Sequence, residues 1–264
     1  MKYIWFSLLI MLIYCAPAHT TTTTSCVHAA PYGVPHIPLV NSQIICRQGL
    51  ALQHDHVARI PVWVSYTLNR NQTLACAARL DRFEPDPQLL PHQRAEVSDY
   101  RRSGFDQGHM APNADQSWDP QVQRESFYLS NVTPQLPSLN RGLWRELEAI
   151  VRAWAYERQS VTIYVGPVYD RIQNQTIGRN RVVVPHAFFK IIIDNQTGEY
   201  QAFWFRHDAQ QPAHVHEVRS TLQHVQYATR IQFPLPAHAQ ESMQTWRYDT
   251  RTHARARQRA CGVP

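Results

Sequence analysis

The segment 140–158 constrains the fold most, because its apolar residues recur at the spacing of an α-helix. A helix over these residues would gather large apolar side chains on one face: Leu143, Leu147, Ile150, Val151 and Trp154. The next segment, 161–168, is apolar and largely β-branched, as is typical of a buried strand. A one-sided helix that leads directly into a buried strand is expected to pack against a sheet.

Strands outnumber helices in the rest of the chain. Apolar and alternating runs predict strands over 60–68, 127–132, 161–168, 182–194 and 199–205. The last two would form a hairpin across 195–198, and a second helix is predicted over 215–227. Proline and charged residues crowd 79–100, which predicts a long loop, a common place for functional side chains. We therefore predict an α+β fold with a central, mostly antiparallel β-sheet flanked by helices.

The charge of the chain favours a polyanionic partner. Its 264 residues suffice for a full core, the apolar fraction of 44% is ordinary, and the formal net charge is +6. Among 26 Lys and Arg residues only Lys2 and Lys190 are lysine. Arginine binds phosphate through a planar fork, so the bias fits a nucleic acid. A general preference for arginine in the proteome would explain the composition equally well.

The N-terminus has the features of a secretory signal peptide. Lys2 supplies a positive charge, 4–14 form an apolar run, and Ala16-Pro17-Ala18 resembles a cleavage site. The run is short for a membrane span, so stable membrane insertion is not expected, although an uncleaved anchor is the alternative. These features predict a secreted or periplasmic protein. The predicted units are a signal peptide over 1–18, an extended Thr/Pro-rich leader over 19–45, and one folded domain over 46–264.

The cysteines fit an exported protein with two disulfides. Removal of a signal peptide would take away Cys15 and leave four cysteines: Cys26, Cys46, Cys76 and Cys261. Four cysteines allow three pairings, and free buried thiols are the alternative. We predict that Cys76 pairs with Cys261 and Cys26 with Cys46. Because no CxxC pair occurs, a cysteine zinc site is not expected.

Candidate catalytic residues concentrate between 104 and 152. The segment 104–112 carries His109, and an imidazole can take a proton from water near neutral pH. Amides and one carboxylate follow at Asn131, Gln135, Asn140 and Glu148. A hard cation such as Mg²⁺ prefers oxygen ligands and keeps several of its waters, so one amide oxygen can hold it. These residue types suit hydrolysis of a phosphodiester with a single hard metal.

The same segments carry a resemblance to a known family. They read Asp106-Gln107-Gly108-His109, Ser130-Asn131-Val132-Thr133-Pro134-Gln135, and a run from Leu139-Asn140 to Leu147-Glu148. Shorter matches lie at 61–66, 83–87, 165–168 and 184–190, so the resemblance covers roughly 46–236. The chain resembles the DNA/RNA non-specific endonucleases, the endonuclease G-like ββα-metal (His-Me finger) nucleases. The resemblance implies a ββα-metal active-site motif within the α+β fold.

The resemblance assigns four catalytic roles. His109 would be the general base and Asn140 the ligand of Mg²⁺, for which Mn²⁺ could substitute. Glu148 would hold a metal-bound water, and Arg152 would neutralise charge at phosphorus. Residues 140, 144, 148 and 152 follow an i, i+4 row on one helix face. The structural alternatives are a helix N-cap for Asn140 and a Glu148–Arg152 salt bridge.

The resemblance also suggests substrate-binding residues. Asn131, a further predicted catalytic residue, and Gln135 would hold phosphate or the hydrated metal, with capping of loop backbone as the alternative. Arg79 is the preferred phosphate-binding arginine before Phe83, ahead of Arg82. One departure concerns Gln107, which stands where the family usually has arginine. A neutral amide there gives a weaker electrostatic hold on the backbone.

These features predict a secreted, Mg²⁺-dependent endonuclease that cuts DNA and RNA with little sequence specificity; a homodimer is left open. An alternative is a secreted nucleic-acid-binding protein on a nuclease scaffold, catalytically weakened by Gln107. A third interpretation is a zinc hydrolase built on His54-Asp55-His56 and His214-Val215-His216. Exposed histidines without a metal would explain those two pairs more simply.

Overall fold

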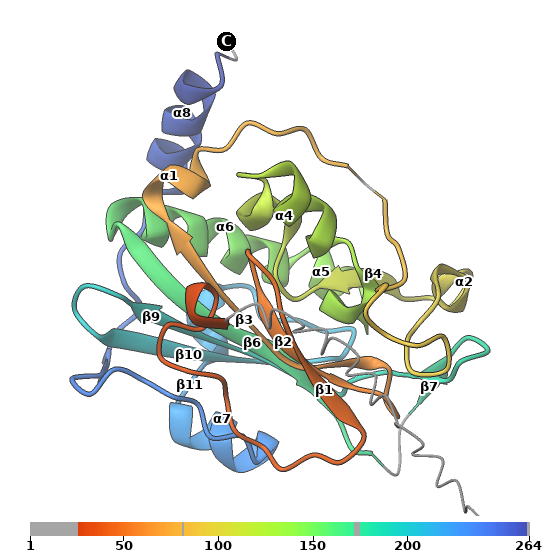
Figure 1. Cartoon of the computed structure of the whole chain (residues 1–264). Helices are drawn as coiled ribbons and strands as arrows, with labels where there is room; N and C mark the ends of the chain where they lie inside the picture. Colours follow the sequence, from red (N-terminus) through yellow and green to blue (C-terminus); the bar gives the residue numbers. More distant parts are fainter. Residues whose placement is uncertain (1–25, 81, 172–174, 263–264) are drawn as a thin grey trace, which may run out of the picture.

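An antiparallel sheet crosses the centre of the molecule (Figure 1). The computed structural model describes residues 26–80, 82–171 and 175–262. Within them the sheet has eight strands, in the order β1-β2-β3-β6-β9-β10-β11, and β12 pairs with β10 in parallel. The strands are β1 (Ser42–Cys46), β2 (Ala51–Asp55), β3 (Ile60–Asn69), β6 (Ser160–Val168), β9 (Ala187–Asp194), β10 (Glu199–Arg206), β11 (Arg219–Ser220) and β12 (Gln240–Glu241).

Helices and loops cover both faces of the sheet, so the fold has three layers (Figure 1). Alternate residues of β3 point to opposite faces: Val64 joins the core under α6 (Leu143–Glu157), whereas Trp63 joins the core under α7 (Leu222–Thr229). The other elements on the α6 side are α1 (Arg70–Thr73), α3 (Asn113–Gln116), α4 (Pro120–Ser126), α5 (Pro137–Asn140) and α8 (Thr250–Ala260). The predicted α+β class, with a mostly antiparallel sheet flanked by helices, is confirmed.

Helix α6 forms where the apolar spacing predicts it. Leu147, Val151 and Trp154 are buried completely, and the Trp154 ring stacks over Phe203 of β10 at 6.2 Å between centroids. The helix begins at Leu143 rather than at 140, because the residues before it form the separate turn α5. The strands predicted over 60–68 and 161–168 and the hairpin between β9 and β10 are also confirmed.

Two predicted elements are wrong. The segment 127–132 is not a strand: η2 (Leu129–Asn131) occupies it, and β5 (Val132–Gln135) starts only after it. The segment 215–227 is not one helix but η3 (Val215–Val218), β11 and α7, because Thr221 caps a new helix by accepting from the His224 amide at 3.1 Å.

The loop predicted over 79–100 is present in its described residues, 79–80 and 82–96, and its last turn is α2 (Val97–Tyr100). A small hairpin, β7 (Thr176–Ile177) with β8 (Val182–Val183), takes the first part of the strand predicted over 182–194. None of the helices in the described ranges is long and apolar enough to cross a membrane.

Both predicted disulfides are confirmed. Cys26, in η1 (Cys26–His28), pairs with Cys46, and Cys76 pairs with Cys261. The first disulfide joins the described part of the predicted leader to β1, and Ala29 in that part is buried against the sheet. The division of the chain at residues 18 and 45 stays a prediction, and 1–25 lie outside the described residues.

Candidate active site

Two short strands and two helices bring the candidate residues together. β4 (Asp106–His109) pairs antiparallel with β5, with Asp106 opposite Gln135 and His109 opposite Val132. The chain then continues through α5 into α6, and α5 contacts both β4 and α6. This strand–strand–helix unit is the ββα arrangement that the sequence predicts.

His109 ends β4 in a slot between two phenyl rings. Its ring centroid lies 4.9 Å from that of Phe83 and 5.1 Å from that of Phe127, and the residue is 9% exposed. Gly108 precedes it, and a Cβ there would lie 2.2 Å from Oε1 of Gln135. Glycine is therefore required for β4 to lie against β5 at this point. The two rings restrict the orientation of the imidazole.

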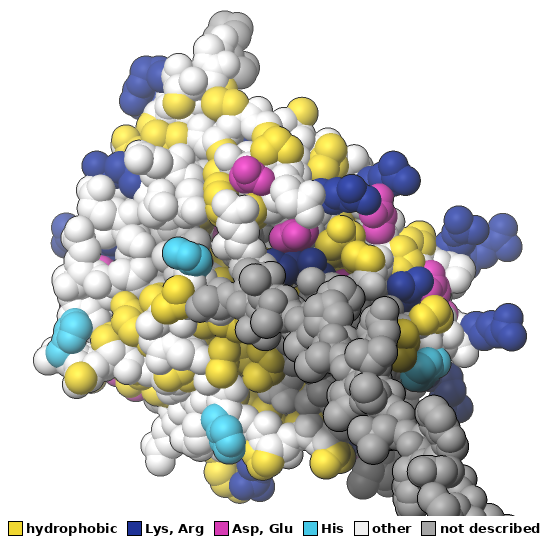
Figure 2. Space-filling model, viewed as in Figure 1, with side chains coloured by type: hydrophobic (Ala, Val, Ile, Leu, Met, Phe, Trp, Pro, Cys, Tyr) yellow, Lys and Arg dark blue, Asp and Glu magenta, His cyan; other side chains and the backbone are white. Residues whose placement is uncertain are grey.

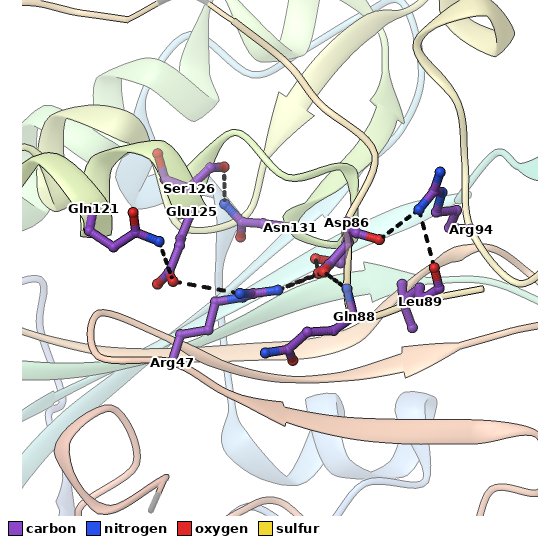
Figure 3. A network of polar contacts seen from close by, with 10 residues as sticks. Arg47, Asp86, Gln88, Leu89, Arg94, Gln121, Glu125, Ser126 and Asn131 are labelled. Atoms are coloured by element: carbon purple, nitrogen blue, oxygen red, sulfur yellow. Dashed lines mark hydrogen bonds and ion pairs between the residues drawn. The ribbon is translucent and has the colours of Figure 1, made fainter. Parts of the chain in front are cut away.

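Asn131 fixes the backbone that follows His109. Its Oδ1 accepts from the Ala111 amide at 2.9 Å, and its Nδ2 donates to the Ala111 carbonyl at 2.8 Å. The same Nδ2 donates to the Ser126 carbonyl at 2.8 Å (Figure 3). The side chain is fully buried, so the structure shows the backbone-holding role. Gln135 is also fully buried, beneath Gly108. Direct contact of Asn131 or Gln135 with substrate stays a prediction.

A buried ion pair ties the long loop to this unit (Figure 3). Nη2 of Arg47 lies 2.7 Å from both carboxylate oxygens of Asp86, which is 0% exposed. Ser130 donates a short hydrogen bond to the same carboxylate, and Arg94 donates to the Asp86 carbonyl at 3.1 Å. Sequence reasoning missed Arg47. The one sequence feature that indicated this ion pair was Asp86, which lies within the short 83–87 match.

Asp106 orients the candidate metal ligand. Nδ2 of Asn140 donates to Oδ2 of Asp106 at 2.9 Å, and Arg141 forms a 2.6 Å ion pair with the same carboxylate. Burial alone would raise the pKa of Asp106, but hydrogen bonds from Arg141 and Asn140 outweigh it and hold that pKa below its ordinary value. Asn140 is the last residue of α5, and Gly142 precedes α6. The N-cap alternative for Asn140 is therefore wrong.

Arg152 is held by a carboxylate that the sequence did not single out. Its Nη1 lies 2.8 Å from Oδ1 of Asp115, which is fully buried and also accepts from the Tyr66 hydroxyl at 2.9 Å. Arg152 thus pairs with Asp115 rather than with Glu148. The signal for Asp115 was weak: a carboxylate six positions after His109, without a motif of its own.

Glu148, which is half-buried, and the fully buried Lys190 interact electrostatically. Burial raises the pKa of Glu148 to about 7, although Lys190 and Arg152 lower it. Lys190 is completely buried, and its Nζ lies 4.3 Å from the centroid of the Trp144 ring. Burial lowers the pKa of Lys190, and Glu148 and Asp115 partly offset that effect. A lysine within an apolar strand was the sequence signal for this residue.

Arg79 lies near the His109 imidazole, whereas Arg82 forms an ion pair with a neighbouring glutamate. The exposed Arg79 guanidinium is 5.5 Å from the centroid of Phe127, the ring that contacts His109. Arg82 pairs with Glu84 at 3.0 Å. Gln107 lies on β4 and is half-buried.

The His-x-His pairs form no metal centre. In the part of the chain that the structure describes, no group of three or more His, Cys, Asp or Glu could hold a metal ion. His54 is fully buried, and burial lowers its pKa to about 3. His214 and His216 are exposed and stack at 5.3 Å between centroids, in η3 and just before it. The zinc-hydrolase interpretation therefore has no site in the described structure.

The chain is similar to known nucleases. It is 34% identical to "Endonuclease G, mitochondrial" of Homo sapiens over 179 residues, which are 64% of this chain and 59% of the human protein. It is 34% identical to "Nuclease 1, mitochondrial" of Schizosaccharomyces pombe over 182 residues, 64% of this chain and 55% of that protein. The chain thus spans less than two thirds of these relatives. The fold also matches a crystal structure of the EndoG/EndoGI complex, with a TM-score of 0.74, 24% identity, and coverage of 81% of this chain and 94% of that one.

These relatives overturn one prediction. The secreted or periplasmic location is wrong, because the similar nucleases are named mitochondrial, which points away from export. The features that suggested export were Lys2, a short apolar run and the Ala16-Pro17-Ala18 sequence. They lie within 1–25, outside the described residues, and such a run does not by itself specify a compartment.

The match to a family extends over most of the chain. Residues 29–240 match the DNA/RNA non-specific endonuclease family, so the match includes all of the ββα unit, the buried Arg47–Asp86 anchor and the central sheet. Together with the geometry around His109 and Asn140, this match shows that the chain belongs to the DNA/RNA non-specific endonuclease family.

Proposed function

We propose that this protein is a metal-dependent endonuclease that hydrolyses phosphodiester bonds of DNA and RNA with little sequence preference. The observation that carries the proposal is the hydrogen bond from Asn140 to Asp106 on β4, the strand that ends in His109. A carboxylate can only accept, so it takes the amide NH₂ of Asn140 and leaves Oδ1 for another ligand. One four-residue strand thus carries the candidate base and orients the candidate ligand.

The donor set fits a hard cation that keeps most of its water. Asn140 offers one neutral oxygen, and no cluster of three or more His, Cys, Asp or Glu in the described ranges could replace that water. Mg²⁺ is held in this manner in proteins, and Mn²⁺ has similar ligand preferences. Asn140 would hold the cation directly and Glu148 through water. When bound, such a cation would offset the negative charge that develops on the phosphate oxygens.

The protein's own residues would position the reactants and move the proton. His109 would take a proton from the attacking water, since its ring is held by Phe83 and Phe127. Arg152, held by Asp115, would present a fixed positive charge to the phosphate. Arg79 would contact the backbone from the loop. Contacts of this kind reach phosphate and sugar, which carry no sequence information, and this supports low specificity.

Chelation of the metal tests the proposal. We expect cleavage of plasmid DNA and of single-stranded RNA to stop in EDTA and to return when Mg²⁺ is added in excess. A nucleic-acid-binding protein without catalysis would bind the same substrates and leave them intact in both conditions. Cleavage that continues undiminished after chelation and dialysis would exclude the metal-dependent mechanism.

Gln107→Arg restores the charge that the family usually carries at this position. If Gln107 faces the phosphate backbone, the new guanidinium should tighten substrate binding and steepen the dependence of log Kd on log salt by about one. Gln107→Met is the matched control, because it changes the side chain without adding charge. Equal salt slopes for the parent and Gln107→Arg would show that this position does not reach the backbone.

A further inference from the structure

Helix α8 gathers positive charge beyond the family region. It begins at Thr250, whereas the family match ends at residue 240. No Asp or Glu lies within the helix. Its four arginines are all exposed: Arg251, Arg255, Arg257 and Arg259. Figure 2 shows dark-blue Lys and Arg side chains at the end of the molecule where α8 lies in Figure 1. A basic helix of this kind attracts polyanions.

The helix is fixed to the domain at several points. His253 and Ala256 are buried on its inner side, where α8 packs on α6, and the His253 ring lies 5.7 Å from that of Tyr156. Nε of Arg257 donates to the Ala75 carbonyl at 3.0 Å. The Cys76–Cys261 disulfide joins the end of the helix to the start of the loop that carries Arg79. The backbone that carries the arginines is therefore held in place before any ligand binds, which lowers the entropic cost of binding.

A cavity that Arg152 lines lies beside α8. It has a volume of about 650 Å³ and lies between α8, α6 and α3. Arg152 lines it from the active-site helix, and Arg251, His253 and Arg257 line it from α8. Ala114, five residues after His109, lies in its wall. No carboxylate is among the described residues that line it, and the charged side chains in its wall are the three arginines Arg152, Arg251 and Arg257.

We propose that α8 and this cavity form an extended phosphate-binding surface, which holds the backbone of a nucleic-acid strand beyond the bond that is cut. The inference rests on the proposed function, because Arg152 would be shared by the scissile phosphate and the next part of the strand. Neighbouring phosphates recur along a strand, and several arginines on one fixed helix near Arg152 can match that repetition. The surface selects for strand length and charge, not for sequence.

Single-charge variants test the proposal. In the full-length protein, Arg251→Gln and Arg255→Gln are compared with Arg230→Gln, which removes one exposed arginine next to α7, on the opposite face of the sheet. Binding of fluorescent single-stranded oligonucleotides of about 6 and about 30 nucleotides is measured in EDTA over a range of salt concentrations. Each α8 variant should weaken binding of the long strand by roughly three- to tenfold and reduce its salt slope by about 0.7. Binding of the short strand should be unchanged.

The outcomes separate the two proposals. If the parent binds and cleaves nucleic acid but the α8 variants match Arg230→Gln on the long strand, the α8 surface is excluded and the proposed function stands. If the parent binds long strands through α8 and cleaves nothing with Mg²⁺, the surface stands and the proposed function fails. Vesicles of phosphatidylserine or of phosphatidylcholine are the competing probe. One result would assign α8 to a membrane surface and overturn the proposal: Arg251→Gln and Arg255→Gln weaken binding to anionic vesicles but leave binding of the oligonucleotides unchanged.

Discussion

Replacement of His109 by alanine should lower the turnover number by about two to four orders of magnitude, the usual contribution of a positioned acid–base group. The imidazole lies at the end of β4 between Phe83 and Phe127, and these rings would keep the rest of the site in place when it is removed. Substrate binding should change little, because the lost group moves a proton rather than holding phosphate. Single-turnover cleavage rates at saturating enzyme measure the effect directly.

Chemical rescue separates catalysis from packing. The truncation leaves a space between the two rings, so added imidazole should restore part of the rate of His109→Ala if proton transfer is what was lost. His109→Gln, which fills the space without a titratable group near neutral pH, should stay inactive and show no rescue. A melting curve of each variant controls for loss of packing. Activity of His109→Ala within a few-fold of the parent would exclude His109 as the base.

The elements that could be predicted from the sequence are those whose signal is local. Helix α6 and strands β3 and β6 have apolar patterns that their own residues determine, and sheet packing only reinforces them. The failures at 127–132 and 215–227 have a different cause. Asp86, more than forty residues away, accepts from Ser130 and contributes to holding the η2 turn, and the Thr221 cap divides an apolar pattern that looks continuous. Hydrogen bonds of single side chains, to the backbone or to a distant side chain, can thus override a weak periodic signal.

The residues of the candidate site also fall into two groups: those that a local motif indicates, and those that only the folded structure brings to the site. Residue type and order along the chain are enough to indicate the site residues that stand in motifs with fixed spacing: His109, Asn140, Glu148 and Arg152. Asp115 and Lys190 reach the site through tertiary packing, and the sequence does not show that both lie near Glu148. Asn131 lies in a motif, yet its three hydrogen bonds all go to backbone. A motif therefore marks residues that the site needs without separating those that support it from those that contact substrate.

Asn140→Ala should abolish most of the activity and remove the saturable response of the rate to Mg²⁺. The amide oxygen is the one protein ligand proposed for the cation, so its loss leaves only contacts through water. The cost in stability should be about 1 kcal/mol, since the change removes the hydrogen bond to Asp106 and no helix cap. A Mg²⁺ titration of the cleavage rate beside a thermal melting curve measures both effects on the same sample.

Asp106→Asn is the matched variant, because it keeps the ligand and changes the group that orients it. An amide at 106 can donate as well as accept, so the Asn140 side chain would no longer be held with Oδ1 directed away from β4. The concentration of Mg²⁺ for half-maximal rate should rise, while the rate at saturation stays within about tenfold of the parent. The two variants thus separate ligation from orientation. A normal Mg²⁺ response of Asn140→Ala, with only a lower melting temperature, would reduce Asn140 to a structural partner of Asp106 and leave the cation without a ligand on α5.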